Sequence, residues 1–442
     1  MKRIDVLPDD VLLEIFDFNL KIFSIYGVKR TTERWQSLAH VCRRWRNLVF
    51  ASPRRLNLQL FCTPKTPARD LLDVWPAFPL IVTGNTTSSP LSGTDNIIAA
   101  LGQSSRVCRV DLSLTRGQLE RVLAAMQVPF PELTDLRLIA HGETLPDTPD
   151  SFLDGSAPRL RNFLLDAIPF PGLPKLLLSA TQLVVLRLFN IQYISPEPMV
   201  ALLSVMSSLT SLSLGFPSPE SPPDWETQSL PPPKRSIIPA LEFFDYRGDI
   251  EYLEDLVPFI DAPQLEIFRM NFIDQIDFDT PQLAQFINRT PKLTKRDVHV
   301  QFDDYYARVV LRSEFKITIS CREPDWQLLS VSRVCNSSLH PLSTVEDLYI
   351  EHEYSKLVLE NDANENILWL QLLLPFTAVK NLYLSNESAI GFTVALQDLV
   401  GGRITEVLPS LQNIFVEGGL EPQFAQLLFD PPISISVWDK KR

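Results

Sequence analysis

The sequence is poor in glycine, cysteine and histidine. Among its 442 residues there are 15 glycines, 5 cysteines and 5 histidines, against 36 prolines. Few glycines and many prolines indicate rigid turns and frequent helix or strand starts rather than flexible linkers. The cysteines are odd in number, widely spaced and free of any Cys-x-x-Cys pair, so they indicate neither a disulfide framework nor a zinc site. We expect reduced, mostly buried thiols.

Long hydrophobic runs are also absent. The most apolar stretch, residues 367–379, is broken by Gln371 and Pro375 and is too short to span a bilayer. No apolar signal segment follows Met1. We therefore expect a chain without a membrane-bound state that resides in the cytoplasm, the nucleus or both.

The short motifs of common catalytic sites are missing too. No GxSxG nucleophile elbow, GxxxxGK phosphate loop, GxGxxG fingerprint or HExxH metal pair occurs. Titratable groups meet at His352–Glu353 and at residues 303–306, but neither place has a nucleophile or a second metal ligand at a useful spacing. We expect surface charge clusters there, and no enzyme activity, catalytic residue, cofactor or metal. A hydrolase site hidden in the body of the chain is the alternative.

Charge is unevenly distributed along the chain. Residues 1–60 hold eleven Lys and Arg against six Asp and Glu, whereas the whole chain carries a net charge of −12. A basic segment of this kind suits an acidic protein partner or a nucleic acid. Its arginines lack interleaved exposed aromatics, and the acidic total opposes binding to phosphates. We expect no nucleic-acid partner.

Two amphipathic helices are predicted near the N-terminus. In LPDDVLLEIFDF, Pro8 suits the first helical position, and Asp9 and Asp10 suit the positive end of the helix dipole. The second helix is predicted from Thr32 to Phe50, with its arginines on the side facing solvent or an acidic partner. Two short helices cannot bury all of this apolar surface on each other, so part of it must dock elsewhere.

These two segments resemble an F-box. LPDDVLLEIF followed by LAHVCRRWRNLV has the Leu-Pro start, the Val-Cys pair and the Trp after basic residues that mark this family. The continuation through residues 51–82 is similar to the layout of the expanded F-box families of mushroom-forming fungi, although residues 19–34 make a longer connection than usual. The resemblance implies that residues 1–52 bind a Skp-type adaptor and, through it, a cullin-RING ubiquitin ligase.

The adaptor-binding positions implied by the resemblance are apolar residues of the two helices. They are Leu7, Pro8, Val11, Leu12, Ile15, Phe16, Leu38, Val41, Cys42, Trp45 and Leu48. Pro8 and Trp45 are the strongest candidates for contact, because aromatic anchors dominate interface energetics. The alternative is that such a stripe forms the core of the module itself.

The phrase LxxLxL returns through the rest of the chain. It begins near residues 107, 133, 160, 183, 209, 241, 265, 293, 345, 379 and 411. A phrase that returns every few tens of residues, as these start positions show, predicts a solenoid. The long gap between 293 and 345 corresponds to two steps, with FKITIS from Phe315 as a degenerate strand inside it. Residues 216–236 form a Pro-rich insertion, interpreted as an exposed loop, in which LPPPKR could instead suit a proline-reading groove.

Helix starts separate these predicted strands, as at Ser195-Pro196 and Thr280-Pro281. We therefore expect an α/β fold in which repeats stack into a curved parallel sheet with helices outside. Ser52-Pro53 ends the second helix, and Leu56, Leu58 and Leu60 are predicted as the first strand. Residues 53–106 would cap the solenoid, and residues 107–442 would form it.

The body resembles a divergent leucine-rich-repeat horseshoe. The family usually places Asn or Cys three residues after the third apolar position, where it satisfies turn backbone groups. Here those places hold His141, Ile168, Ile191, Pro217, Asp249 and Ile273. We therefore expect the turns to be satisfied in another way.

The residue between the last two apolar places of each strand should point to the concave face, because side chains alternate along a strand. That column reads Arg137, Leu164, Arg187, Ser213, Asp245, Arg269, Asp297, Tyr349, Tyr383 and Phe415. The candidate target-binding residues are Arg187, Arg269, Tyr349, Tyr383 and Phe415. The aromatic end, with Glu351 and Glu417 on the same face, would suit a ligand with apolar and basic features. Alternatively, these aromatics reflect strand propensity alone.

Together these features predict a non-enzymatic substrate-recognition subunit of a Skp-cullin-F-box type ubiquitin ligase. The F-box-like helices would hold the adaptor, and the repeat body would bind a protein target that the sequence does not identify. The alternative is a repeat scaffold or interaction protein that has an F-box-like module without ligase function.

Overall fold

The computed structural model describes most of the chain. The residues it leaves undescribed are 1–6, 26–33, 54, 57, 75, 86–91, 143–145, 217–234, 274, 276–277, 294–296, 312–314, 322, 338–339, 353–362, 386–387, 390–403, 419–432 and 439–442. The chain divides into two compact units, Met1–Leu183 and Val184–Arg442. The boundaries predicted at residues 52 and 106 stay predictions, and the Pro-rich insertion lies almost wholly outside the described residues.

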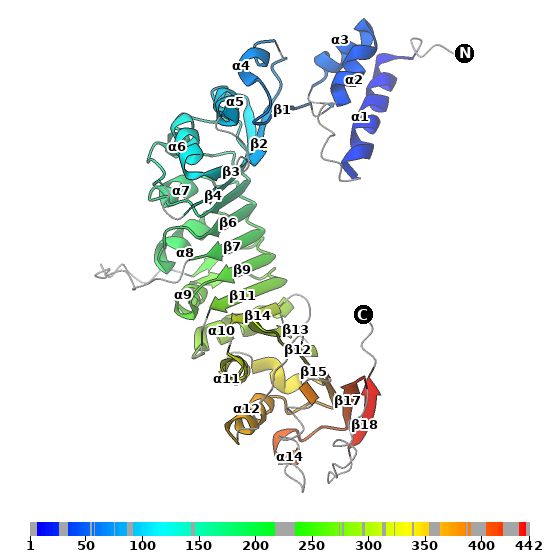
Figure 1. Cartoon of the computed structure of the whole chain (residues 1–442), viewed down its shortest axis with the longest axis vertical. Helices are drawn as coiled ribbons and strands as arrows, with labels where there is room; N and C mark the ends of the chain where they lie inside the picture. The colour runs from blue at the N-terminus through cyan, green and yellow to red at the C-terminus, as the bar shows by residue number, and fades with distance from the viewer. Residues whose placement is uncertain are drawn as a thin grey trace. The chain divides into compact units, whose positions relative to one another are not determined.

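Unit 1 begins with three helices and continues with alternating strands and helices (Figure 1). Its elements are α1 (Asp9–Ile25), α2 (Arg34–Val41), α3 (Arg43–Ala51), β1 (Leu60–Cys62), α4 (Ala68–Leu71), β2 (Leu80–Asn85), α5 (Ser92–Leu101), β3 (Val107–Thr115), α6 (Arg116–Ala125), β4 (Asp135–His141), a 3-10 helix (Phe152–Gly155), β5 (Asn162–Asp166) and α7 (Leu173–Ser179). The strands β1 to β5 pair in sequence order, and every pair is parallel.

The second N-terminal helix is predicted as one element but forms two. It is interrupted at Cys42, whose backbone is extended and whose Sγ accepts a hydrogen bond from Trp45 N at 3.5 Å. Cys42 therefore caps α3, because a side-chain acceptor at this position satisfies one of the free N–H groups of the first turn. The first strand is also shorter than predicted. Leu56 and Leu58 are buried but precede the strand, and β1 starts at Leu60.

Unit 2 carries the rest of the repeats. Its strands are β6 (Val185–Phe189), β7 (Ser211–Gly215), β8 (Ser236–Ile237), β9 (Phe243–Arg247), β10 (Ile260–Asp261), β11 (Ile267–Ile273), β12 (Asp297–Phe302), β13 (Tyr306–Leu311), β14 (Phe315–Ser320), β15 (Asp347–His352), β16 (Asn381–Leu384), β17 (Asn413–Glu417) and β18 (Ser434–Trp438). Its α-helices are α8 (Pro196–Ser204), α9 (Ile250–Leu256), α10 (Pro281–Arg289), α11 (Pro324–Ser337), α12 (Ala363–Leu373) and α14 (Ile404–Val407). Its 3-10 helices are Val257–Phe259, Pro291–Leu293 and His340–Thr344.

The predicted α/β repeat class is confirmed, but the sheet of unit 2 is not wholly parallel. Its order is β6-β7-β9-β11-β14-β13-β12-β15-β16-β17-β18, with β13 antiparallel to both of its neighbours. The connection between β12 and β13 spans only residues 303–305, where Asp303 N donates to Tyr306 O at 2.9 Å. So short a connection can join only antiparallel strands, since a parallel crossover needs a dozen or more residues.

The apolar places of the LxxLxL phrase form the core in both units. In β6, Leu186 and Leu188 are fully buried, while Arg187 between them is exposed. Figure 1 shows α4 to α7 of unit 1 on one face of its strands, and α8 to α12 of unit 2 on one face of theirs. None of the helices that the structure describes in unit 2 covers the other face of its strands. We call that other face of unit 2 the open sheet face. Strand alternation therefore sends every second side chain to it.

Threonine hydroxyls placed just before a strand bond to backbone carbonyls of the preceding repeat. Thr134 Oγ1 donates to Cys108 O at 3.1 Å, and Thr210 Oγ1 repeats this contact with Val184 O at 3.2 Å. At the start of the later strands, Asn413 Nδ2 donates to Asn381 Oδ1 at 2.8 Å. The chain lacks the usual asparagine or cysteine at the predicted turn positions. Other side chains form hydrogen bonds between neighbouring repeats.

Candidate functional site: two protein-binding surfaces

The N-terminal helices present one apolar face inward and another outward. Leu12 and Phe16 of α1 are fully buried, and the Phe16 ring packs on Trp45 with centroids 4.6 Å apart. Val11 and Ile15, by contrast, are each 42% exposed. Residues at i and i+4 share a helix face, so Val11 and Ile15 form an exposed apolar stripe beside the buried one.

The eleven predicted adaptor-binding residues therefore fall into three groups. Leu12, Phe16 and Leu38 are buried in the module. Leu7, Cys42, Trp45 and Leu48 are half-buried, and Pro8, Val11, Ile15 and Val41 are exposed. The interpretation as a core fits the buried residues of the stripe. The interpretation as a contact surface fits the exposed residues. Whether the exposed part binds an adaptor stays a prediction.

Two arginines of this module have a role beyond the predicted exposure, although Arg43 and Arg46 are exposed as expected. Arg44 Nε donates to Asp9 Oδ1 at 3.0 Å, and Arg44 Nη2 donates to Leu7 O at 2.6 Å. Arg46 Nε donates to Ala39 O at 3.0 Å. They were expected to face solvent or an acidic partner, but they fasten α3 to the start of α1 and to α2. The geometry of three short helices is fixed in this way.

The five predicted target-binding residues all lie on the open sheet face of unit 2. Arg187 and Arg269 are exposed, and Tyr349, Tyr383 and Phe415 are half-buried. Tyr349, Tyr383 and Phe415 also share one register across β15, β16 and β17. One member of the predicted column is displaced: Asp297 pairs with Asp347, and His299 occupies the place beside Tyr349. The column on β12 is therefore shifted by two residues relative to its LxxLxL phrase.

Four rings on neighbouring strands form a continuous aromatic stack, defined here as His299, Tyr349, Tyr383 and Phe415. Their successive centroids are 4.2, 4.3 and 4.6 Å apart, with interplanar angles of 4°, 9° and 10°. Trp438 of β18 lies across the stack, 5.4 Å from Tyr383 and 5.9 Å from Tyr349. Burial among these rings raises the pKa of Tyr349 to about 12, with the neighbouring Tyr383 as the next cause.

Glu351 lies at one end of the aromatic stack and is only 4% exposed. Its Oε1 is 3.6 Å from His299 Nδ1, and its Oε2 accepts a hydrogen bond from Gln301 Nε2 at 3.4 Å. The carboxylate and the stack thus share His299. A charged group this buried needs such contacts, because desolvation otherwise penalises it.

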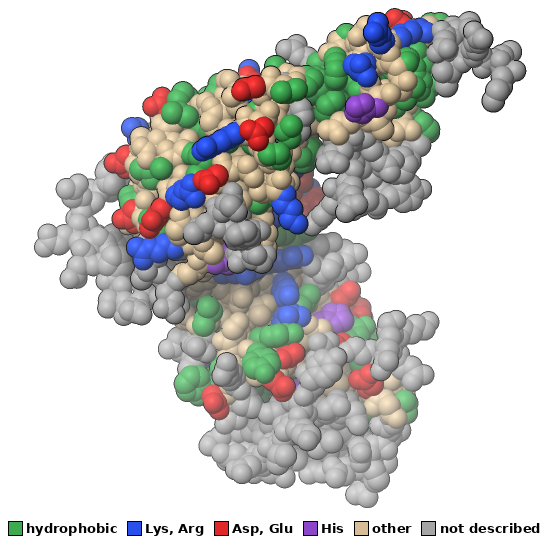
Figure 2. Space-filling model, turned by 45° about the horizontal axis from the view of Figure 1, so that its top comes forward, with side chains coloured by type: hydrophobic (Ala, Val, Ile, Leu, Met, Phe, Trp, Pro, Cys, Tyr) green, Lys and Arg blue, Asp and Glu red, His purple; other side chains and the backbone are tan. Residues whose placement is uncertain are grey.

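The neighbouring part of the open sheet face is basic. The basic patch, as we define it, consists of Arg187, Arg247, Arg269, Arg308 and Lys316. Asp245 pairs directly with Arg269 across β9 and β11, and Arg269 pairs with Lys316 across β11 and β14. Burial raises the pKa of Asp245 despite these cations, and burial together with Arg308 and Arg269 lowers the pKa of Lys316. Lys and Arg side chains gather near the centre of Figure 2.

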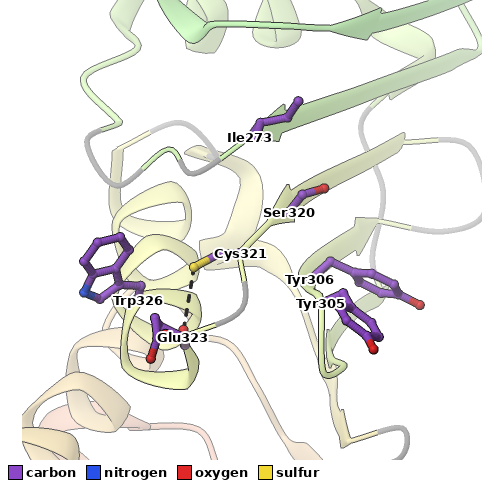
Figure 3. A pocket seen from close by; sticks show the side chains of 7 residues that line it. All are labelled: Ile273, Tyr305, Tyr306, Ser320, Cys321, Glu323 and Trp326. Carbon is purple, nitrogen blue, oxygen red and sulfur yellow. Dashed lines mark hydrogen bonds between the residues drawn. The ribbon is translucent and has the colours of Figure 1, made fainter. Parts of the chain in front are cut away.

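A pocket of about 600 Å³ lies at the end of the same strands. It is lined by Ile273, Tyr305, Tyr306, Ser320, Cys321, Glu323 and Trp326. Figure 3 shows these side chains coming from β11, the β12–β13 turn, β13, β14 and the start of α11. The lining is mainly apolar and aromatic, a composition suited to holding an apolar side chain.

The titratable groups singled out in the sequence have structural contacts where the structure describes them. His352 Nδ1 lies 2.7 Å from Ser388 Oγ, a pairing that sequence reasoning missed, but Ser388 is fully buried and bonds Ser385 Oγ at 2.9 Å. Glu353 lies outside the described residues. Among the residues that the structure describes, no group of three or more His, Cys, Asp or Glu could hold a metal ion. In the same part of the chain, no helix is long and apolar enough to cross a membrane.

Comparisons with known proteins assign no family. No protein-family model matches the chain. No curated protein matches it either. One solved structure that it is similar to is the crystal structure of the Rad7 and Elc1 complex in yeast, at 15% sequence identity and a TM-score of 0.29. That match covers 97% of this chain and 92% of the other. At this TM-score the likeness alone does not establish a shared fold.

Proposed function

We propose that the chain is the substrate-recognition subunit of a Skp-cullin-F-box type ubiquitin ligase. The N-terminal helices would bind the adaptor, and the open sheet face of unit 2 would bind the target. The chain itself would supply no catalytic group; it would raise the local concentration of the target beside the transfer chemistry of other subunits. It would act in the cytoplasm or the nucleus, with no cofactor.

The observation that carries this proposal is the exposed apolar stripe on α1. Val11 and Ile15 stay accessible although Leu12 and Phe16, one position further along, are fully buried. Phe18 on the same helix is 66% exposed, and Val41 at the end of α2 is 58% exposed. Exposed apolar side chains on so small a module are typical of a surface that a partner covers. The resemblance of LPDDVLLEIF and LAHVCRRWRNLV to an F-box supplies the class of that partner.

The test is co-purification of the full chain with a co-expressed Skp-type adaptor. The wild-type chain should capture the adaptor, and a variant with Val11→Asp and Ile15→Asp should not. Val128→Asp is a matched control, because Val128 is 46% exposed but lies outside the helical module. Circular dichroism should show that both variants fold. The proposal fails if the wild-type chain captures no adaptor, or if the double variant captures as much.

The ligase role and the scaffold role make different predictions for the target. A substrate receptor should lower the abundance of its target, so removing the chain should raise that abundance. A scaffold should leave it unchanged. The comparison is most informative with the Val11→Asp and Ile15→Asp variant in place of the missing chain. If turnover of the target depends on the adaptor, the Val11→Asp and Ile15→Asp variant should fail to restore it. If turnover does not depend on the adaptor, the variant should restore it.

A further inference from the structure

Three members of the basic patch, Arg269, Arg308 and Lys316, lie on the strands β11, β13 and β14 that also line the pocket. Ile273 and Arg269 are four residues apart on β11, and Ser320 and Lys316 are four residues apart on β14. Four residues along a strand span roughly 13 Å. Ile273 also pairs with Ser320, and Ser320 pairs with Tyr306 on β13. The pocket and the patch are therefore adjacent parts of one surface.

Arg308 connects the two parts. Its guanidinium carbon is 4.4 Å from the centroid of the Tyr306 ring, which lines the pocket. Its Nη1 donates to Gln301 Oε1 at 3.3 Å, which holds the side chain over the sheet. Arg308 is also the largest charged influence on Lys316 after burial. A ligand that leaves the pocket along the strands would meet Arg308 first and then Lys316 and Arg269.

The charge of this surface is not balanced within the described residues. No carboxylate there lies within 4.0 Å of the cationic nitrogens of Arg269, Arg308 or Lys316. Asp245, the register partner of Arg269, has its ion-pair contact at 3.7 Å with Arg247. On the other side, Gln301 lies between Arg308 and the buried Glu351. Cations without a directly paired carboxylate repel each other, so the field they create favours an anionic partner.

The lining of the pocket favours an apolar ligand group over a charged one. Ile273, Tyr305 and Trp326 are 52%, 62% and 46% exposed, which is unusual for side chains of this size gathered at one place. Glu323 at the same pocket disfavours a carboxylate there. Aromatic side chains that line a pocket are the usual anchors for a buried apolar residue of a partner.

From these observations we infer that the pocket and the basic patch bind an extended acidic peptide segment with one apolar anchor residue. The anchor side chain enters the pocket between Tyr305 and Trp326. The carboxylates that follow it along the chain meet Arg308, Lys316 and Arg269. The identification of this peptide as the target segment of a ligase receptor rests on the proposed function. The binding of the peptide itself needs no adaptor.

The experiment measures binding of a fluorescein-labelled peptide, in which one Phe is followed by a run of Asp and Glu, to the purified full chain by fluorescence anisotropy. The wild-type chain should bind it, and rising salt should weaken binding because exposed charges are screened. Arg269→Glu and Trp326→Ala should each weaken binding by about tenfold, a loss typical of interface anchors. Arg116→Glu on α6, an exposed arginine of unit 1, and Phe18→Ala should leave it unchanged.

Peptide variants separate the two halves of the site. Replacing Phe with Ala should weaken binding to the wild-type chain but not to the Trp326→Ala variant. Replacing Asp and Glu with Asn and Gln should abolish binding. Equal affinity for the neutral peptide, or no effect of Arg269→Glu, would overturn the inference. Because Val11→Asp with Ile15→Asp should still bind the peptide, failure of adaptor capture and failure of peptide binding are distinguishable.

Discussion

The rings of Tyr349 and Tyr383 stack face to face across β15 and β16, with centroids 4.3 Å apart and planes 9° apart. His299 covers the other face of Tyr349 at 4.2 Å. Each such ring pair contributes about 0.5–1.5 kcal/mol beyond the area it buries. Tyr349→Ala removes three ring pairs, with His299, Tyr383 and Trp438, so we expect it to lower the free energy of unfolding by roughly 1.5–4.5 kcal/mol. Chemical denaturation followed by circular dichroism measures the change.

Tyr349→Phe is the matched control for the aromatic stack. It keeps the three ring contacts and removes only the hydroxyl with its hydrogen bond to Tyr383, so the denaturation midpoint should fall much less than in Tyr349→Ala. The same midpoint for Tyr349→Ala would show that the stack adds no stability. The aromatic column would then reflect strand propensity, which is the alternative that the sequence leaves open.

The raised pKa of Tyr349 predicts a loss of stability in alkali. Burial raises that pKa from 10.0 to about 12, so the folded chain keeps the phenol proton after the unfolded chain has lost it. The contribution of the protonated Tyr349 to the free energy of unfolding is fully present below pH 10 and is lost as the pH rises to about 12. We expect the denaturation midpoint to fall across this window, and Tyr349→Phe to reduce the fall. Burial also raises the pKa of Tyr246, so part of the fall should remain.

The repeat fold was predictable because its signal is local. Leu183, Leu186 and Leu188 occupy the first, fourth and sixth places of one phrase, and all three are fully buried. Alternation along a strand then assigns the side chains between them to the other face. The hairpins formed by β12, β13 and β14 were missed because β13 carries no LxxLxL phrase. Its alternation from Tyr306 to Leu311 was the available signal.

The candidate site was only partly predictable. Tyr349, Tyr383 and Phe415 follow from the repeat, but the register places His299 beside them through pairing of β12 with β15. Lys316 and Arg308 lie in the gap that the repeat skipped, so they were not assigned to the column. Contacts of this kind depend on strand order, which a periodic pattern does not contain.

The cysteines should differ in reactivity according to burial. Cys62, Cys321 and Cys335 are buried, and Cys42 and Cys108 are half-buried. Burial raises the pKa of Cys62 to about 11 and also raises the pKa of Cys335, which disfavours the reactive thiolate. In the native chain at neutral pH, iodoacetamide should label Cys42 first and leave the buried thiols unmodified. Mass spectrometry of the labelled peptides measures this order.

Labelling in denaturant provides the control for this order. All five thiols should then react, because unfolding removes the burial that protects them. Rapid native labelling of Cys335 would contradict the burial of α11 against the sheet. A disulfide-linked pair found under non-reducing conditions would contradict the free thiols of the structure.

Ser385 replaces the turn-satisfying asparagine of regular repeats after β16. Its Oγ accepts a hydrogen bond from His352 N at 3.0 Å and from Ser388 N at 3.3 Å, and the residue is 1% exposed. Ser385→Ala leaves these buried N–H groups without that acceptor. A buried donor without its acceptor costs about 1–3 kcal/mol, so the free energy of unfolding should fall by this amount.

Ser204→Ala is the matched control for Ser385→Ala. Ser204 Oγ donates to Ala201 O at 2.7 Å on the exposed end of α8, where water can replace the lost bond. This variant should therefore change the free energy of unfolding little. Hydrogen exchange at the His352 amide should accelerate in Ser385→Ala and stay unchanged in Ser204→Ala. Equal effects of the two substitutions would show that the hydroxyl of Ser385 does not satisfy the turn, and that some other group accepts from His352 N.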